Sequence, residues 1–199
     1  HAAGAYLTYY SNDATRLGAY ADVWMQYGRY SNQISSELGT ARYRSDLWSA
    51  SLESGYALMP FPAGSPLGGL VVEPAAQLVY GRYQARDATL QGTLMQNDKD
   101  KTWNSRVGVR LYPRAAAGAA TAALHPFLEA NWLRDGGSAS VRMGDSTLNA
   151  ASARNAFELK LGAEGRLGNA LRLSGHIFGK LGSGDQRGYG GTLRADYRW

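Results

Sequence analysis

The stretch Tyr189-Gly190-Gly191-Thr192-Leu193-Arg194-Ala195-Asp196-Tyr197-Arg198-Trp199 forms the C-terminal end of the sequence. Counted in twos, one set of positions is apolar with aromatic ends, and the other set carries arginine, aspartate and threonine. Successive side chains of a β-strand point to opposite faces of the sheet. The stretch is therefore predicted to be a strand with one apolar face and one charged face. An edge strand of a soluble β-sandwich would show the same alternation.

Composition narrows the class of protein that this strand belongs to. The 199 residues are enough for one sizeable domain, and 44% of them are hydrophobic. No apolar run approaches the roughly 18 residues of a transmembrane helix, which excludes a helical membrane protein but not a barrel of alternating strands. The 25 glycines, 13 tyrosines and 5 tryptophans favour a β protein with aromatic girdles. The sequence begins at His1 without an initiator methionine or signal peptide, so we expect a fragment or a processed product.

Several kinds of chemistry are excluded or disfavoured at the same stage. The chain has no cysteine, so it offers no disulfide, no thiolate zinc ligand and no thiol nucleophile. The net charge of +5 is not gathered into a basic helix or stripe, and no nucleic-acid partner is expected. His125 and His176 have no partner at metal-ligand spacing, and no nucleophile elbow is present. We therefore expect no catalytic residue, no metal site and no cofactor.

The alternation recurs about nine times, at the spacing of an antiparallel meander. The most regular example places Leu159 and Leu161 on one face and Glu158 and Lys160 on the other. Polar or charged loops are expected at residues 31–42, 85–101 and 134–152, and residues 114–124 as a short helix or a turn. No domain boundary is predicted within residues 1–199. The expected strands cover residues 3–10, 16–30, 43–58, 70–84, 103–112, 125–133, 157–167, 171–181 and 189–199.

The connections between these strands alternate in character. Those after the odd-numbered strands are short or rich in proline, glycine and alanine, whereas those after the even-numbered strands are more polar, with long charged examples. Outer-membrane barrels have short periplasmic turns and longer outside loops. This predicts that Trp199 lies at the periplasmic end and His1 near the outside. A single-chain barrel normally starts and ends in the periplasm, so we expect an odd number of strands to precede His1.

Two features favour a membrane barrel, which turns its apolar face to lipid, over a soluble barrel, which buries it. Aromatic residues on the apolar face of the strands lie towards the strand ends, as the aromatic girdles at a membrane interface do. They are Trp48, Tyr56, Tyr80, Trp132 and Trp199. Several strands also exceed the roughly 10 residues needed to cross a bilayer with a tilt. We therefore predict an all-β, antiparallel transmembrane β-barrel. In lipid the sheet must close, so about nine strands need further strands to complete it.

Five segments resemble, in the same order, strands of autotransporter β-domains, especially the AIDA-like adhesin branch. The segment His125-Pro126-Phe127-Leu128-Glu129-Ala130-Asn131-Trp132 looks like the P-F-(V/L)-E-x-N-W strand of that family. The resemblance implies a barrel of about twelve strands, of which these are the last nine, with a missing front that holds a pore-plugging α-helix. The other four segments cover Gly18–Trp24, Glu73–Gln77, Arg106–Arg110 and Lys160–Gly165.

The resemblance also implies a function, type V secretion. The barrel would be anchored in the outer membrane of a Gram-negative bacterium, and an N-terminal passenger, such as an adhesin or virulence factor, would reach the cell surface through or beside its lumen. The implied partners are the chain's own passenger and linker helix, the barrel-assembly machinery, periplasmic chaperones, and lipid or lipopolysaccharide. The C-terminal strand resembles the signal that the assembly machinery recognises, carried here by Leu193, Ala195, Tyr197 and Trp199.

The alternation of side chains along each strand assigns a set of polar residues to the lumen of the barrel. One interpretation is a network that neutralises itself and holds the barrel shape, because isolated buried charge is unfavourable. The other is contact with the linker helix, which some autotransporters cut inside the barrel with acidic and asparagine side chains. Glu129 and Asn131 have the types of side chain needed, but the linker is absent from the sequence. The predicted lumen residues are Glu53, Glu73, Gln77, Arg106, Arg110, Glu129, Asn131, Glu158, Arg172 and Arg194.

An outer-membrane barrel with porin, adhesin or hydrolase activity is the alternative. A hydrolase would need catalytic groups gathered at the outer rim or on the lipid-facing wall, and the sequence provides no such group. A porin or adhesive barrel would need a different N-terminal half. The residues upstream of His1 distinguish these alternatives, because a translocator carries a passenger and a helix there.

Overall fold

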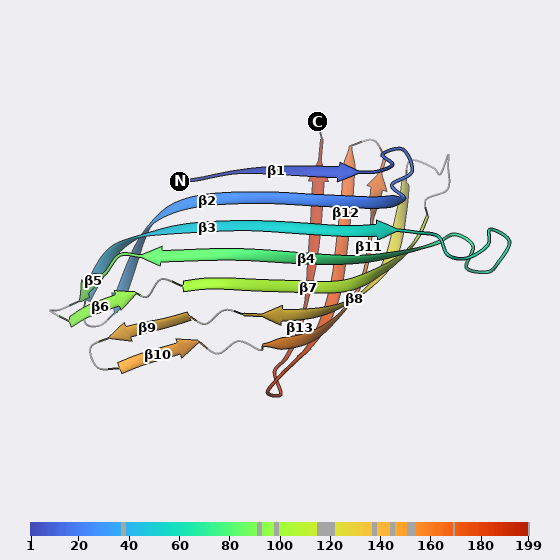
Figure 1. The fold of residues 1–199 in the computed structure, drawn as a ribbon. Helices are drawn as coiled ribbons and strands as arrows, with labels where there is room; N and C mark the ends of the chain where they lie inside the picture. Colours follow the sequence, from blue (N-terminus) through green and yellow to red (C-terminus); the bar gives the residue numbers. More distant parts are fainter. Residues whose placement is uncertain are drawn as a thin grey trace.

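Nine long strands form one antiparallel sheet in the computed structural model, which describes residues 1–36, 39–90, 93–97, 100–114, 122–136, 139–143, 146–150, 154–168 and 170–198. The sheet order is β1-β2-β3-β4-β7-β8-β11-β12-β13, and each strand pairs with the next in an antiparallel register (Figure 1). The predicted all-β antiparallel fold is confirmed. The strands are β1 (Ala2–Tyr10), β2 (Gly18–Ser36), β3 (Gly39–Ala57), β4 (Leu70–Ala85), β7 (Asp100–Pro113), β8 (Ala122–Asp135), β11 (Asn155–Leu167), β12 (Leu171–Gly182) and β13 (Arg187–Tyr197).

A second, four-stranded sheet is built from two of the connections. Its strands are β5 (Ala88–Leu90), β6 (Thr93–Asn97), β9 (Ala139–Met143) and β10 (Ser146–Ala150), in the order β10-β9-β6-β5. The prediction of loops at residues 85–101 and 134–152 was therefore wrong where the structure places strands. A period of two marks a strand with one buried and one exposed face. These connections form hairpins by backbone pairing with each other, which leaves no such pattern in the sequence.

Strands β2 and β3 are longer than predicted, because their pairing continues through residues 31–36 and 39–42. The loop predicted for residues 31–42 was wrong for the same reason. Here most side chains on both faces are polar, apart from the paired Ile34 and Ala41, and cross-strand side-chain hydrogen bonds accompany the ladder. The Asn32 amide donates to Ser45 Oγ over 2.8 Å, and Arg42 Nε donates to Gln33 Oε1 over 3.1 Å. Alternation is absent from this part because apolar side chains are needed only where lipid or a core covers one face.

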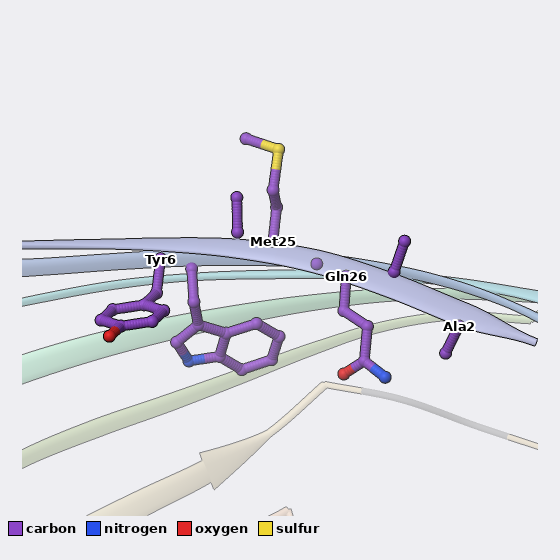
Figure 2. A pocket seen from close by; sticks show the side chains of 8 residues that line it. Ala2, Tyr6, Met25 and Gln26 are labelled. Atoms are coloured by element: carbon purple, nitrogen blue, oxygen red, sulfur yellow. The ribbon is translucent and has the colours of Figure 1, made fainter.

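The distribution of burial is the inverse of that in a soluble barrel. Leu161 and Ile177 are 55% and 64% exposed, whereas Asn131 is 2% exposed and Ser51 is also buried. Figure 2 shows the alternation on β2, where Met25 points away from the other strands. The apolar side chains thus lie on the outer face and the polar ones on the inner face, as predicted.

Two rows of aromatic side chains border the outer apolar band. Near the end that carries the second sheet are Tyr27, Trp48, Tyr80, Trp103 and Trp132; the ring centroids of Tyr27 and Trp48 lie 5.4 Å apart, and those of Tyr80 and Trp103 lie 4.5 Å apart. Tyr9, Tyr56 and Tyr197 lie exposed near the opposite ends of their strands. Paired aromatic belts of this kind mark the two interfaces of a transmembrane barrel. Trp199, which was predicted to belong to a girdle, lies outside the described residues.

The sheet curves into a half-barrel, so that β1–β4 form one wall and β11–β13 another (Figure 1). Strands β1 and β13 stand at its two edges and each pair with a single neighbour among the described residues. No helix in the described part is long and apolar enough to cross a membrane. Of the predicted short helix or turn at residues 114–124, residues 115–121 lie outside the described residues, and residues 122–124 belong to β8.

Candidate functional site: a charge network on the concave face

Arg106 occupies the centre of an ionic network on the concave face. One of its terminal nitrogens lies 2.7 Å from a Glu53 carboxylate oxygen, and the other lies 3.0 Å from Glu129 Oε1. Arg106 stands on β7, while Glu53 and Glu129 stand on β3 and β8. The guanidinium therefore links strands that are two apart in the sheet as well as direct neighbours. Such charge-assisted pairs are stronger than hydrogen bonds between neutral groups.

The network continues onto β11 through Lys160 and Asn131. Lys160 Nζ lies 3.4 Å from Glu129 Oε1 and 3.1 Å from Glu158 Oε1. Asn131 Nδ2 donates to the same oxygens of Glu129 and Glu158, over 2.7 and 3.1 Å. At the other end, the Tyr20 hydroxyl donates to Glu53 Oε1 over 3.1 Å. Each of the three carboxylates thus has at least two partners, as burial of charge requires.

Smaller groups lie beside this network. The Tyr112 hydroxyl donates to Glu73 Oε2 over 2.7 Å, and the Gln77 amide donates to Ser51 Oγ over 3.1 Å. Arg110 donates to Glu164 Oε1 over 2.9 Å, and its guanidinium carbon lies 4.1 Å from the centre of the Phe127 ring. The Tyr112–Glu73 and Arg110–Glu164 contacts extend the polar face towards the end of the strands away from the second sheet, whereas the Gln77–Ser51 contact lies level with Arg106 or nearer to that sheet.

A cavity of about 620 Å³ opens beside these groups. Thr8 and Asp22 line it from β1 and β2, and Arg172 lines it from β12, which lies seven strands away in the sheet order. Residues from opposite walls therefore face one space, which identifies the concave side as the interior of the barrel. The buried Nε of Arg110 has no hydrogen-bond partner in the described part of the chain.

The structure brings together five of the ten predicted lumen residues, namely Glu53, Arg106, Glu129, Asn131 and Glu158. Glu73, Gln77 and Arg110 lie on the same face in separate groups, and Arg172 lines the cavity. Arg194 is apart from all of them, because it stands on the edge strand β13 and pairs with Asp196 two residues on.

Three partners of the inner-face carboxylates were missing from the predicted set: Lys160 and Tyr20 in the network, and Tyr112 in a group beside it. Strand parity places all three on the inner face, so the signal was present in the sequence. A set drawn mainly from carboxylates and arginines omits them, although hydroxyl donors and a lysine satisfy the same carboxylates. Of the predicted assembly signal, Leu193 and Tyr197 are exposed on the outer face of β13, Ala195 shares their parity, and Trp199 lies outside the described residues.

The network has the chemistry of a structural site. Its carboxylates are engaged by cations and amides, and no group of three His, Cys, Asp or Glu side chains able to hold a metal ion occurs among the described residues. The arrangement cross-links strands of the wall and leaves a wet, charged interior.

An antiparallel sheet with an apolar exterior between aromatic belts and an ion-paired interior defines the class of outer-membrane-type β-barrels. Comparison with known families makes the assignment more specific. The chain belongs to the autotransporter β-domain family, because the sequence model of that family, described as Autotransporter beta-domain, matches residues 1–177.

Curated relatives agree with this assignment. Over its whole length the chain is 31% identical to the uncharacterized protein YdeU of Escherichia coli (strain K12), of which it covers 44%. It is 29% identical to the probable autotransporter YfaL of the same strain and covers 15% of it. It is 25% identical, over 99% of its length, to the autotransporter adhesin AIDA-I of Escherichia coli and covers 16% of it. The chain thus spans less than half the length of these relatives.

Solved structures show the same fold. The transport unit of the autotransporter AIDA-I from Escherichia coli matches with a TM-score of 0.80 at 25% identity, over 100% of this chain and 65% of that chain. The β-domain of the Bordetella autotransporter BrkA matches with a TM-score of 0.67 at 22% identity, over 100% of this chain and 71% of that chain. The similarity to AIDA-I in both sequence and structure supports the AIDA-like branch.

Removing the Arg106 charge is expected to destabilise the barrel. In Arg106→Met, Glu53 loses its cation while Glu129 keeps Lys160. We expect the free energy of unfolding to fall by about 2 kcal/mol, less than for a fully buried pair because these side chains are partly exposed. Urea unfolding of the full-length protein, followed by tryptophan fluorescence, measures this.

The matched control is Arg194→Met, which removes an arginine from an exposed pair on the edge strand. Its expected effect is much smaller than that of Arg106→Met, because solvent screens an exposed pair. The double variant Arg106→Met/Glu53→Gln should recover most of the loss, since Glu53 no longer needs a cation. Equal effects of the two single variants would contradict a stabilising network.

Proposed function

We propose that residues 1–199 form the wall of an outer-membrane barrel that anchors the protein and mediates export of its own N-terminal passenger to the bacterial cell surface. The observation that carries the proposal is the inverted polarity of the sheet in a member of the autotransporter β-domain family. Large apolar side chains such as Leu161 are exposed, and polar ones such as Asn131 are buried. That distribution suits lipid outside and water inside.

The proposed location is the outer membrane of a Gram-negative bacterium, with the second sheet outside the cell. Two hairpins, β5–β6 and β9–β10, extend from one end of the half-barrel (Figure 1). The C-terminal strand ends at the opposite end, where Tyr197 pairs with Leu171 beside the short β11–β12 turn. Long connections outside and short turns in the periplasm are the arrangement of such barrels.

We further propose that strands outside residues 1–199 close the barrel, so that these residues are the greater part of one translocator domain. Strands β1 and β13 are edges, and unpaired backbone groups are unfavourable in lipid. The coverage of 65% of the AIDA-I transport unit agrees with a domain that includes further residues. Closure would join the two edges through those strands.

The inner face is proposed to have two roles. The network around Arg106 holds the barrel shape, because its charges neutralise each other. The region near Arg110 and Arg172 contacts the linker helix of the passenger, since Arg110 Nε lacks a partner and Arg172 lines the cavity. This proposal assigns the chain no catalytic role. The barrel-assembly machinery and periplasmic chaperones are the proposed partners during insertion, with the C-terminal strand as the recognised element.

Protease accessibility on whole cells tests the proposed export. In cells that express the full-length protein, we expect external protease to digest the passenger while a periplasmic marker stays intact. Deletion of residues 1–199 should leave the passenger protected inside the cell. The passenger's appearance at the surface after that deletion, or its retention in the periplasm when the chain is present, would rule the translocator role out.

A further inference from the structure

Cations are concentrated on the outer face at and just beyond the aromatic belt, at the end that carries the second sheet. On this face Arg82 of β4 lies directly between Trp48 of β3 and Lys101 of β7 in the strand register. Arg82 and Lys101 are both exposed, and neither has a carboxylate partner in the described structure. Like charges directly opposite each other destabilise a sheet. Among the described residues no carboxylate balances this row, so a bound anion would stabilise it.

A second cation pair lies beside the first. The Arg86 amide donates to the Arg44 carbonyl over 2.9 Å, which continues the β3–β4 ladder and places these two arginines opposite each other. Together with Arg29 of β2, Arg44, Arg82, Arg86 and Lys101 form what we call the outer basic patch. All five stand on the parity of the apolar outer face.

Asp46 is the one carboxylate among the outward-facing side chains described on β2, β3, β4 and β7. It accepts hydrogen bonds from Arg29 Nε over 3.0 Å and from the Tyr27 hydroxyl over 2.8 Å. These bonds, that from Arg29 first, hold the pKa of Asp46 below its ordinary value. Asp46 is thus already paired with Arg29, and the charge of Arg86 also acts on it, so that among the described residues Arg82 and Lys101 are left without a carboxylate partner.

We propose that the outer basic patch binds the phosphate groups of lipopolysaccharide in the outer leaflet. The inference rests on the proposed function, which places this end of the barrel at the cell surface. Aromatic belts mark the depth of the lipid headgroups. In the register, Arg82 and Lys101 lie level with Trp48 and one row beyond Trp103, and the other arginines of the patch lie further out. Arginine binds phosphate through paired hydrogen bonds, and lysine does so as a point charge. A lipid whose headgroup carries several phosphates matches a patch of several cations.

Binding of fluorescently labelled lipopolysaccharide to the full-length protein, purified in detergent, tests the proposal. Each cation near a charged membrane surface contributes about 1 kcal/mol, so Arg82→Gln/Lys101→Gln should weaken binding about 30-fold. The charge-matched control is Arg114→Gln/Arg166→Gln, at the opposite end of the strands, and its binding should stay within about 2-fold of the parent. Arg82→Lys in the parent background, which keeps the charge, should retain most of the binding.

Two further ligands identify the source of the phosphate. Lipopolysaccharide stripped of its phosphates should bind the parent and the Arg82/Lys101 variant equally weakly. Vesicles of phosphatidylglycerol should compete poorly, because each headgroup carries a single phosphate. Unchanged lipopolysaccharide binding by the Arg82/Lys101 variant, an equal loss in the control variant, or equal competition by phosphatidylglycerol would overturn the proposal.

Passenger display in the same cells separates this inference from the proposed function. If the parent displays its passenger but the Arg82/Lys101 variant binds lipopolysaccharide as well as the parent does, the proposed lipid site fails and the translocator role stands. If the parent does not display its passenger, the proposed translocator role is contradicted, whatever the lipopolysaccharide binding. Heat-modified gel mobility confirms that each variant used in the comparison is folded.

Discussion

Replacing Leu161 by arginine should destabilise the barrel in a lipid bilayer by about 2–4 kcal/mol, the range for a cation at the midplane of the lipid face. Leu161 lies near the middle of β11, and its neighbours in the register are Leu128 and Ile177. All three side chains are exposed on the outer face, in the centre of the apolar band. Urea unfolding in phospholipid vesicles measures the loss.

The control is the same substitution at a residue that lies nearer to the membrane surface. Leu181 is also exposed on the outer face, but it pairs with Phe157 near the outer end of β11 and β12. Arginine there can reach the headgroups, so Leu181→Arg should be unfavourable by no more than about 1 kcal/mol. If the outer face met water instead of lipid, both substitutions would be nearly neutral. Equal effects at the two depths would therefore refute the assignment of this face to the bilayer.

Valine in place of Gly162 should destabilise the barrel by about 3 kcal/mol. A Cβ atom at this position would lie 2.5 Å from the Gly175 backbone oxygen and 2.6 Å from Cζ of Phe127. The oxygen belongs to the paired strand β12, and Phe127 is buried beneath the Arg110 guanidinium, so neither can move aside easily. Overpacking usually destabilises by about 1–3 kcal/mol, and a clash with backbone belongs at the upper end.

Gly179 on β12 is the matched control, because an added Cβ there would meet nothing within 4 Å. Gly179→Val should change the free energy of unfolding by less than about 0.5 kcal/mol. The folded fraction is read from heat-modified gel mobility and the stability from urea unfolding in vesicles. If both glycine variants folded to the same extent, a close contact at Gly162 would not be a feature of the fold.

The curved sheet also explains why some residues of the inner network could be predicted and others could not. Parity alone placed Glu53, Arg106 and Glu129 on one face, because side-chain direction along a strand has a period of two. Which of them meet depends on the register between strands, which the sequence does not state. The pairing of Glu53 with Gln77, of Gln77 with Arg106 and of Arg110 with Glu129 sets β3, β4, β7 and β8 in the relative positions that let Arg106 reach two carboxylates. Arg194 has the alternation of the inner face, but it lies on the edge strand β13 and contacts none of these residues.

The sequence by itself determined the class of fold, the polarity of the two faces and the order of the main strands. Each of these follows from local alternation, which lipid on one side and water on the other impose on every membrane-crossing segment. Only the tertiary structure decided the extra length of β2 and β3, the second sheet, and the partners of each charge. These depend on backbone pairing between distant segments, as between β6 and β9, and backbone hydrogen bonds leave no mark on residue type.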